Sequence, residues 1–334
     1  MNEIMYIENP TNRESLVSII IPTYNRSAYL KDAIESVVQQ TYQNIEIIVS
    51  DDYSTESPQA TVESFKDKRI RFRRNTTNLG VALNVTKALK EVQGKYIAYL
   101  NDDDIWNKDF LEKLVPHLDF HQDVVLAFCD HYIIDSDGKI NYPDTEKNTA
   151  HWKRNQLKEG IYKPFWEIGL IHKAVFAASS TVIRKDAVEW DQLHEAGVFW
   201  DYYISYLACC SGLGAYYCPE RLTQYRVHDQ SETMLSGSRN VQAKLRKAKA
   251  GIFCYDRFMR DERLKQFKPY FAQQWAHANT TMAIALLRAG QIAEARPYLL
   301  RALSQQKFNL RTLAALTLSF TPQPLARKLL SSSK

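Results

Sequence analysis

The residues best suited to chemistry in this chain are an amide and three carboxylates, Asn101 to Asp104, which directly follow an apolar segment. Residues 96–100 are aromatic or aliphatic, a composition typical of a buried β-strand. Adjacent carboxylates repel one another, and a bound cation relieves that repulsion. Mg²⁺ and Mn²⁺ prefer oxygen ligands of this kind. The segment therefore predicts a divalent cation site at the end of a strand, with a solvated acidic turn as the alternative.

Two other apolar segments also lead directly into polar side chains. Residues 17–21 are followed by the polar group 23–25, and residues 45–49 are followed by Asp51 and Asp52. Tyr24, within the first group, could stack on a nucleotide base. Asp52 could accept a hydrogen bond from a ring N–H, a donor that uracil and thymine offer. A helix-entry packing role for Tyr24 and a loop-capping role for the aspartates are the structural alternatives.

Amphipathic segments with helical periodicity separate the predicted strands. Helices are expected at 27–38 (with Ser27 as the N-cap), 81–92 and 110–118, and further strands at 70–73, 124–129, 175–184, 214–218 and 222–227. This alternation predicts an α/β fold with a mainly parallel sheet flanked by helices. Ligands bind outside the carboxyl ends of the strands in such sheets. The three polar clusters should therefore face one crevice.

The bulk composition is that of an ordinary globular protein, with 334 residues, 45% apolar residues and a net charge of +5. This charge is compatible with a phosphate-bearing ligand or an anionic membrane, and nothing indicates a nucleic-acid partner. The five cysteines show no metal-ligand spacing, which favours reduced thiols and a cytoplasmic location. No secretory signal and no transmembrane helix is expected.

The pattern along the chain predicts three regions. Residues 1–14 read as a flexible tail, 15–237 as the α/β domain, and 238–334 as an all-α extension. Within the α/β domain, residues 141–170 are polar and irregular, and we expect a mobile loop over the crevice.

The extension contains one helix–turn–helix at 275–303, similar to a single tetratricopeptide hairpin around Gly290. One such hairpin cannot bury a core alone, so we expect it to pack on the first domain, or on a partner in a homo-oligomer. The basic, leucine-containing end near Arg327 and Lys328 suggests peripheral contact with the inner face of a membrane as a further hypothesis.

Four segments resemble, in order and spacing, the motifs of family 2 glycosyltransferases, which are inverting enzymes with the GT-A fold. They are residues 17–26, 47–55, 78–80 and 94–104. Two later segments also resemble the family. Residues 198–203 correspond to the segment of the catalytic base, with Trp200 in place of the usual Glu, and 224–228 correspond to a basic segment near the diphosphate.

The resemblance implies a role for each matching residue. Asp201 would be the catalytic base, and Asp103 and His228 would bind the Mn²⁺ or Mg²⁺ ion. The residues implied in nucleotide-sugar binding are Pro22, Thr23, Tyr24, Asn25, Arg26, Asp51, Asp52, Asn78, Gly80, Asn101, Asp102 and Arg226. Asn101 departs from the family's Asp-x-Asp motif, and Asp102 or Asp104 could compensate for the lost charge.

The implied function is transfer of a sugar, with inversion, from a nucleotide-diphospho-sugar to an acceptor hydroxyl. A UDP- or dTDP-linked donor is favoured, and a glycan or lipid-linked acceptor in polysaccharide, glycolipid or cell-surface glycan synthesis is expected. Two alternatives remain open. A sugar nucleotidyltransferase could share the acidic rim, although residues 22–26 lack its Gly-rich basic loop. A degenerate domain acting as a non-catalytic scaffold is the other.

Overall fold

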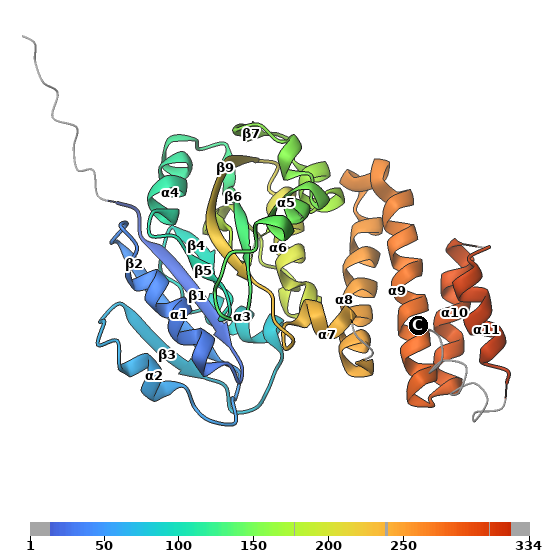
Figure 1. Ribbon diagram of the computed structural model, residues 1–334. Helices are drawn as coiled ribbons and strands as arrows, with labels where there is room; N and C mark the ends of the chain where they lie inside the picture. Colours follow the sequence, from blue (N-terminus) through green and yellow to red (C-terminus); the bar gives the residue numbers. More distant parts are fainter. Residues whose placement is uncertain (1–13, 177, 238–239, 307, 322–334) are drawn as a thin grey trace, which may run out of the picture.

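The computed structural model describes residues 14–176, 178–237, 240–306 and 308–321 (Figure 1). Residues 1–13 of the predicted tail and the basic C-terminal end lie outside the described residues. The strands are β1 (Val17–Thr23), β2 (Ile45–Asp51), β3 (Ile70–Arg74), β4 (Tyr96–Tyr99), β5 (Ile105–Trp106), β6 (Val124–Ile134), β7 (Gly160–Tyr162), β8 (Thr181–Arg184) and β9 (Gly214–Arg226).

The α-helices fall into two groups along the chain. Those interspersed with the strands are α1 (Ser27–Val38), α2 (Gln59–Glu63), α3 (Val81–Leu89), α4 (Phe110–Phe120), α5 (Tyr142–His151) and α6 (Trp200–Cys210). Those that follow the last strand are α7 (Glu232–Gly237), α8 (Val241–Arg260), α9 (Lys268–Ala289), α10 (Ile292–Gln305) and α11 (Leu310–Leu318). Short 3-10 segments include η4 (Leu193–Phe199), directly before α6, and a π-helical segment spans η2 (Glu167–Ile171).

Within the described residues, the strands form one sheet in the order β3-β2-β1-β4-β8-β6-β9-β5, and β7 pairs with β9. The first part of this order is parallel, because β2 and β4 both run parallel to β1, and β3 runs parallel to β2. The carboxyl ends of β1, β2 and β4 therefore meet at one edge. Beyond β4 the sheet is mixed, since β8 runs antiparallel to both β4 and β6.

The two faces of the sheet bury different sets of side chains. On β1, Val17, Ile19 and Ile21 pack with α1 and α4, whereas Ile20 points to the opposite core, which α3 and α6 cover. This alternation is the period of two expected of a strand that is buried on both faces. The predicted α/β architecture is confirmed, and it fixes which residues emerge at the carboxyl edge.

The C-terminal helices extend sideways from the sheet in chain order, α8 to α11 (Figure 1). The core that α6 and the sheet share continues into them, because it includes Cys254 and Phe258 of α8 and Phe271 of α9. The predicted helix–turn–helix corresponds to α9 and α10, and Gly290 ends α9 in the left-handed conformation with a φ of 83°. The hairpin is therefore joined to the sheet domain through α8.

Several local expectations were wrong. Residues 141–170 are not an irregular loop, because they form α5, β7 and most of η2, and none of them lines the cavity described below. Among the described residues of the predicted strand 175–184, the strand covers only β8. The two strands predicted at 214–218 and 222–227 are one continuous strand, β9. Ser27 is the first residue of α1, and the cap position belongs to Arg26, which makes no side-chain cap.

Candidate active site

A cavity of about 920 Å³ lies at the edge where β1, β2 and β4 end. Most of the predicted site residues line it: Pro22, Thr23, Tyr24, Asn25, Arg26, Asp52, Asn78, Gly80, Asn101, Asp102, Asp103 and Asp201. The prediction that the three strand-end clusters face one crevice is therefore confirmed. Asp51, Arg226 and His228 lie behind this lining.

Asp52 organises the loop between β3 and α3. Its Oδ1 accepts hydrogen bonds from the Leu79 N–H and the Asn75 amide, both at 2.9 Å, and its Oδ2 accepts one from the Gly80 N–H at 2.8 Å. Gly80 has a φ of 81°, a backbone conformation that residues other than glycine rarely adopt. The Asp52 carboxylate thus holds the Asn78–Gly80 turn at the cavity wall.

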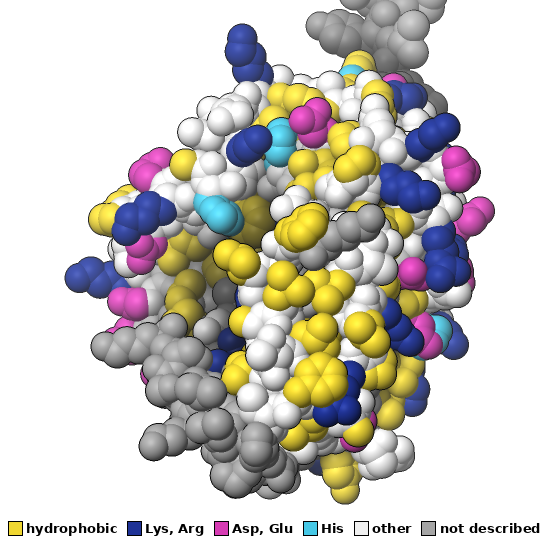
Figure 2. All heavy atoms as spheres, turned by 90° about the vertical axis from the view of Figure 1, so that its right-hand side faces the viewer, with side chains coloured by type: hydrophobic (Ala, Val, Ile, Leu, Met, Phe, Trp, Pro, Cys, Tyr) yellow, Lys and Arg dark blue, Asp and Glu magenta, His cyan; other side chains and the backbone are white. Residues whose placement is uncertain are grey.

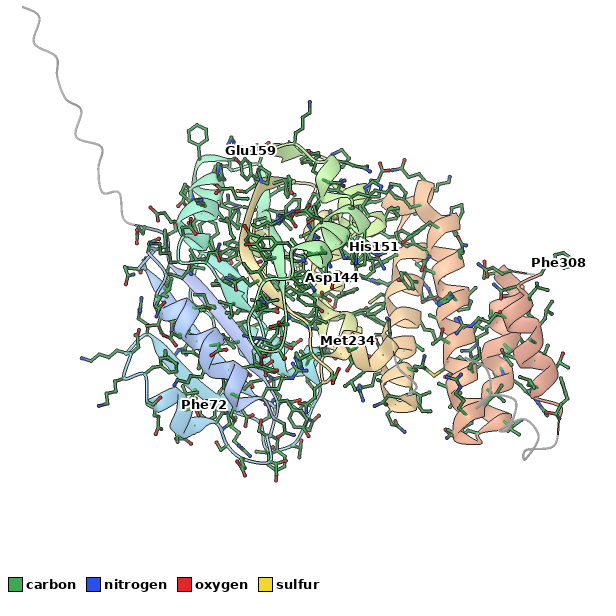
Figure 3. All side chains as sticks on the ribbon, in the orientation of Figure 1. Phe72, Asp144, His151, Glu159, Met234 and Phe308 are labelled. Carbon is green, nitrogen blue, oxygen red and sulfur yellow. The ribbon has the colours of Figure 1, made fainter. Side chains whose placement is uncertain are left out.

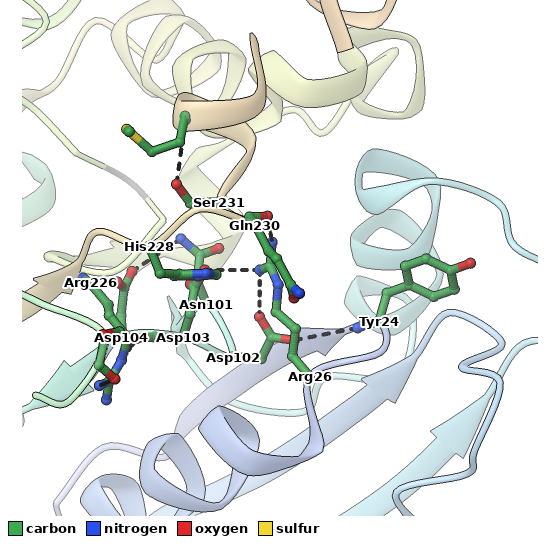
Figure 4. A network of polar contacts seen from close by, with 12 residues as sticks. Tyr24, Arg26, Asn101, Asp102, Asp103, Asp104, Arg226, His228, Gln230 and Ser231 are labelled. Atoms are coloured by element: carbon green, nitrogen blue, oxygen red, sulfur yellow. Dashed lines mark hydrogen bonds and ion pairs between the residues drawn. The ribbon is translucent and has the colours of Figure 1, made fainter. Parts of the chain in front are cut away.

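Tyr24 and Asn25 lie at the rim of the cavity. The Tyr24 ring is 46% exposed and points away from the acidic cluster (Figure 4). Asn25 has a φ of 56°, and its side-chain oxygen accepts a hydrogen bond of 2.7 Å from the Thr55 N–H. An exposed aromatic ring on a fixed turn can offer a flat stacking surface to a ligand.

Arg26 lies at the centre of the polar network in Figure 4. Its Nη1 is 3.0 Å from Asp102 Oδ1 and 2.9 Å from Asp103 Oδ2, and its Nη2 donates to the Gln230 carbonyl at 3.0 Å. His228 Nε2 is 3.0 Å from the same Asp103 Oδ2. Burial opposes the charge of the guanidinium, but the neighbouring carboxylates outweigh it and raise the pKa of Arg26.

Asp102 is held from two sides. The Thr23 hydroxyl donates to its Oδ2 at 2.7 Å, and Arg26 contacts its Oδ1. Burial raises the pKa of Asp102 to about 6, against the opposing effect of the Arg26 charge. The carboxylate therefore ties β1 to the acidic turn.

Asp103 and His228 fit the side of a divalent cation site. Asp103 Oδ2 and His228 Nε2 are hydrogen-bonded at 3.0 Å, and a carboxylate oxygen and an imidazole nitrogen are both ligand types that such ions accept. The Arg26 guanidinium, held by Asp102 and Asp103, shows that this point attracts positive charge. No group of three or more metal-binding side chains occurs in the part of the chain that the structure describes. Mg²⁺ commonly takes its other ligands from substrate phosphates and water.

The amide at position 101 is hydrogen-bonded to the buried carboxyl of Asp104. The Asn101 side-chain amide donates to Asp104 Oδ2 at 3.1 Å, a contact that an aspartate at position 101 could not make. Asp104 is fully buried and also accepts hydrogen bonds from the Ser179 hydroxyl and the Arg226 N–H. Burial, followed by the charge of Asp103, raises the pKa of Asp104. Asp104 lies away from the cavity, so it cannot compensate there for the missing charge at position 101.

Asp51 and Arg226 are buried and form ion pairs with other side chains of the protein. Asp51 is fully buried and forms an ion pair of 2.9 Å with Arg74. Arg226 is 2% exposed, donates to the Asp103 carbonyl at 2.8 Å and pairs with Asp32 at 3.1 Å. Both side chains support the acidic turn or the β2 end from behind and do not reach the cavity.

Asp201 lies in the first turn of α6 and lines the same cavity as Asp52. Burial raises the pKa of its carboxyl to about 6, although backbone N–H groups and the Lys173 charge act in the other direction. The Lys173 ammonium donates to the Tyr255 hydroxyl at 3.2 Å and lies 4.6 Å from the centre of the Tyr202 ring. Burial lowers the pKa of Lys173 to about 8. A carboxylate with a pKa near 6 is suited to accept a proton at neutral pH.

Several cavity residues were not found from the sequence. They come from the segment before β8, from η4, from the end of β9 and from the C-terminal helices, and include Phe176, His194, Glu195, Tyr225, Glu232, Arg246 and Lys249. The only signal for the last two was a basic stretch on a predicted helix. That stretch gave no indication of which residues it would meet.

A parallel half-sheet, an acidic turn at its edge and a half-buried carboxylate in the same cavity are the features expected of a GT-A glycosyltransferase site. The family model described as Glycosyl transferase family 2 matches residues 18–187, just over half of the chain. The chain therefore belongs to glycosyl transferase family 2. This membership disfavours the sugar nucleotidyltransferase alternative.

Characterised and uncharacterised relatives share this assignment. An uncharacterized glycosyltransferase of Haemophilus influenzae is 29% identical over 69% of this chain and 71% of its own length. The putative teichuronic acid biosynthesis glycosyltransferase TuaG of Bacillus subtilis is 33% identical over 42% of this chain and 60% of its own length. The Escherichia coli enzyme WfgD, named UDP-Glc:alpha-D-GlcNAc-diphosphoundecaprenol beta-1,3-glucosyltransferase, is 42% identical over 29% of this chain and 38% of its own length.

Solved structures support the fold. The mannosyltransferase PcManGT of Pyrobaculum calidifontis was solved in complex with GDP-Man and Mn²⁺. The alignment covers 96% of this chain and 85% of the PcManGT chain, with a TM-score of 0.54 and 16% identity. For TarS of S. aureus in complex with UDP-GlcNAc, the alignment covers 91% of this chain and 90% of the TarS chain, with a TM-score of 0.56 and 14% identity. The GT-A fold is therefore shared.

Proposed function

We propose that the protein transfers a sugar from a nucleotide-diphospho-sugar to an acceptor hydroxyl with inversion at the anomeric carbon. The observation that supports this most strongly is that Asp201 lines the same cavity as Asp52 and the acidic turn. The residues proposed for donor binding and the proposed base therefore share one space. A scaffold without activity would have no reason to keep an ionisable carboxyl half-buried at this position.

In the proposed reaction, Asp201 removes the proton of the acceptor hydroxyl as that oxygen attacks the anomeric carbon. The bond to the nucleoside diphosphate breaks as the new bond forms, so the configuration inverts in one displacement. Asp52 and the Asn78–Gly80 turn position the nucleobase of the donor, and Tyr24 offers it a stacking surface. General-base assistance of this kind contributes about 10² to 10⁴ in rate.

Asp103 and His228 would hold a Mn²⁺ or Mg²⁺ ion, with Asp102 close by. Bound there, the ion would supply positive charge to the diphosphate leaving group. Arg26 contacts the same carboxylates, so its side chain must release Asp103 or share it when the ion binds. The likeness to PcManGT, whose structure contains Mn²⁺, supports this proposal.

The donor and pathway are proposed from the relatives. WfgD and TarS are named or crystallised with UDP-linked ligands, which favours a UDP-sugar, while dTDP- and GDP-sugars remain to be compared. TuaG and WfgD point to synthesis of a cell-surface polysaccharide, with a glycan or lipid-linked acceptor.

We also propose contact between the C-terminal helices and the inner face of an anionic membrane. Residues 295–334 contain seven Lys and Arg residues and no Asp or Glu. Apolar side chains gather on the face formed by α10 and α11 (Figure 2), where Leu310 is 81% exposed. Phe308 is 88% exposed and points away from the protein at the end of the molecule (Figure 3). Basic residues around exposed apolar side chains suit an anionic lipid surface.

One further finding and one alternative bear on this contact. No helix among the described residues is both long and apolar enough to span a bilayer. The same exposed face could instead pair with a second copy of the chain, and light scattering separates that outcome from lipid binding.

A ligand screen tests the proposed function. Ligand binding raises apparent stability with the logarithm of saturation, so UDP-, dTDP- and GDP-sugars can be compared by thermal shift. We expect one nucleotide class to raise the melting temperature in the presence of Mn²⁺, and less so in its absence. The Asp52→Asn variant provides a matched control, because it disrupts the Asn78–Gly80 turn. No shift with any donor would contradict the proposal.

A further inference from the structure

The N-terminal half of α8 brings basic side chains to the cavity. Between Glu232 and Asp256 the sequence contains five Lys and Arg residues and no acidic residue. Arg246 and Lys249 line the cavity, and because they are three positions apart they share one face of the helix. The sheet domain alone would not have supplied these cations.

α8 is fixed to the wall that carries Asp201. A Cβ added to Gly197 would lie 3.5 Å from Ala250 Cβ, and one added to Gly251 would lie 3.5 Å from the Phe199 ring. Gly197 and Phe199 belong to η4, the segment that leads directly into α6 and Asp201. Lys249 therefore lies on a helix that packs against the segment leading into the proposed base.

The two cations differ in their present partners. Arg246 forms an ion pair of 2.9 Å with Glu232, and these side chains are 50% and 36% exposed. Among the described residues, no ion pair or hydrogen bond engages the Lys249 ammonium, which is exposed. A solvent-accessible pair and a free ammonium are available to an incoming anion, since exposed pairs of this kind hold their partners weakly.

We propose that Arg246 and Lys249 bind a phosphate group of the acceptor, so that the acceptor is a phosphorylated glycan or a lipid-linked sugar diphosphate. This inference rests on the proposed function. The donor diphosphate is expected at the acidic turn, where the cation at Asp103 would contact it. Arg and Lys are the side chains suited to phosphate recognition. α8 would thus complete the acceptor site.

The test uses geranyl diphosphate as the diphosphate probe and geraniol as its uncharged counterpart. Binding is measured by calorimetry on the full chain with saturating UDP and Mn²⁺, so that the donor site is already filled. The test variant is Arg246→Gln/Lys249→Gln. The control variant is Lys244→Gln/Lys247→Gln, which removes the same charge at the same spacing from a face of α8 that does not line the cavity.

We expect the test variant to bind geranyl diphosphate about 10- to 100-fold more weakly than the wild type, from the typical strength of charged hydrogen bonds. The control should change by less than about threefold, and geraniol should bind poorly to all three proteins. Glu232→Gln should bind the diphosphate probe more tightly than the wild type does, because Arg246 loses its competing partner.

Four results would overturn the inference. Equal losses in both double variants would mean that only the diffuse charge of α8 acts. A loss of UDP affinity in the test variant would assign the two cations to the donor. If UDP does not bind the wild type with Mn²⁺ present, the proposed function fails, and the acceptor assignment fails with it. Normal UDP binding with unchanged geranyl diphosphate binding rejects the acceptor site alone.

Discussion

Replacing Asp201 by asparagine should make the protein more stable while removing its activity. Burial raises the pKa of this carboxyl from 3.8 to about 6, so the folded protein holds an ionised group where the neutral form is favoured. Each pKa unit corresponds to about 1.4 kcal/mol. The ionised carboxylate therefore costs up to about 3 kcal/mol of folding free energy above pH 6. Asparagine keeps the shape and removes the charge, so that cost disappears.

The pH dependence of this gain follows from the raised pKa. The folded state binds the proton more tightly than the unfolded state, so the wild-type carboxyl favours folding at low pH, and this contribution is lost as the pH rises from about 4 to about 6. The gain from Asp201→Asn should therefore be full at pH 8, about half as large at pH 5, and absent below about pH 4.

Urea unfolding at pH 8 and pH 5 measures the gain, and donor turnover measures the loss of activity. Turnover should fall by about 10² to 10⁴. Asp186→Asn is the control, because that side chain is 85% exposed and the change should stay within about 0.5 kcal/mol. A less stable Asp201→Asn protein at pH 8, or an equal gain at both pH values, would refute the reasoning.

Four other predictions follow from the site and the end helices. The acidic limb of kcat/KM should lie near pH 6, and Lys173→Met should move it to higher pH, because the Lys173 charge lowers the pKa of Asp201; an unmoved limb would count against their coupling. Arg26→Gln should bind Mn²⁺ more tightly in the absence of substrate, measured by the paramagnetic resonance signal of free Mn²⁺, because the guanidinium no longer occupies Asp103; weaker binding would mean that Arg26 supports the cation site. Asp52→Asn should lower UDP affinity at least about tenfold by calorimetry, since an amide cannot accept all three N–H bonds that hold the turn; unchanged affinity would separate the turn from the nucleotide. Leu310→Ser should reduce sedimentation with phosphatidylglycerol vesicles but not with phosphatidylcholine vesicles, and a dimer that dissociates on the same substitution would favour self-association instead.

The location of the acidic edge could be predicted from the sequence, because the order and direction of the strands determine it. Once β1, β2 and β4 are parallel, their carboxyl ends must meet, and the polar residues that follow them must share an edge. Asp52 and Asp103 were therefore expected at the cavity from local patterns, whereas Asp201, which lies on α6, was expected there only from the family motif; all three line it.

The polar interior could not be predicted in the same way. The environment of Asp104 depends on Ser179 and Arg226, which are 75 and 122 positions away in the sequence. Whether Asn101 weakens the site or completes it cannot be judged without those partners. Arg226 was expected at the nucleotide-sugar from its resemblance to the family's basic segment, and only the packing shows that its buried side chain pairs with Asp32.

The elements that were missed lacked the usual hydrophobic periodicity. α5 is polar, and its inner face buries Thr145 and Thr149 instead of aliphatic side chains. Asn141 caps it by accepting a hydrogen bond of 3.1 Å from the Asp144 N–H. For α8 the helix itself was expected, but its contact with η4 is a long-range packing choice, and that contact is what brings Arg246 and Lys249 to the cavity.

Release of nucleoside diphosphate from the donor tests the central claim most directly. Wild type and Asp201→Asn are incubated with the donor identified by the ligand screen, with Mn²⁺ and with a hydroxyl acceptor or water, and UDP affinity is measured on the same samples. We predict release by the wild type, a loss of about 10² or more in the variant, and equal nucleotide affinity in both. Equal release by the two proteins, or no release by a wild type that binds the donor, would contradict the assignment of Asp201 as the base of a glycosyl transfer.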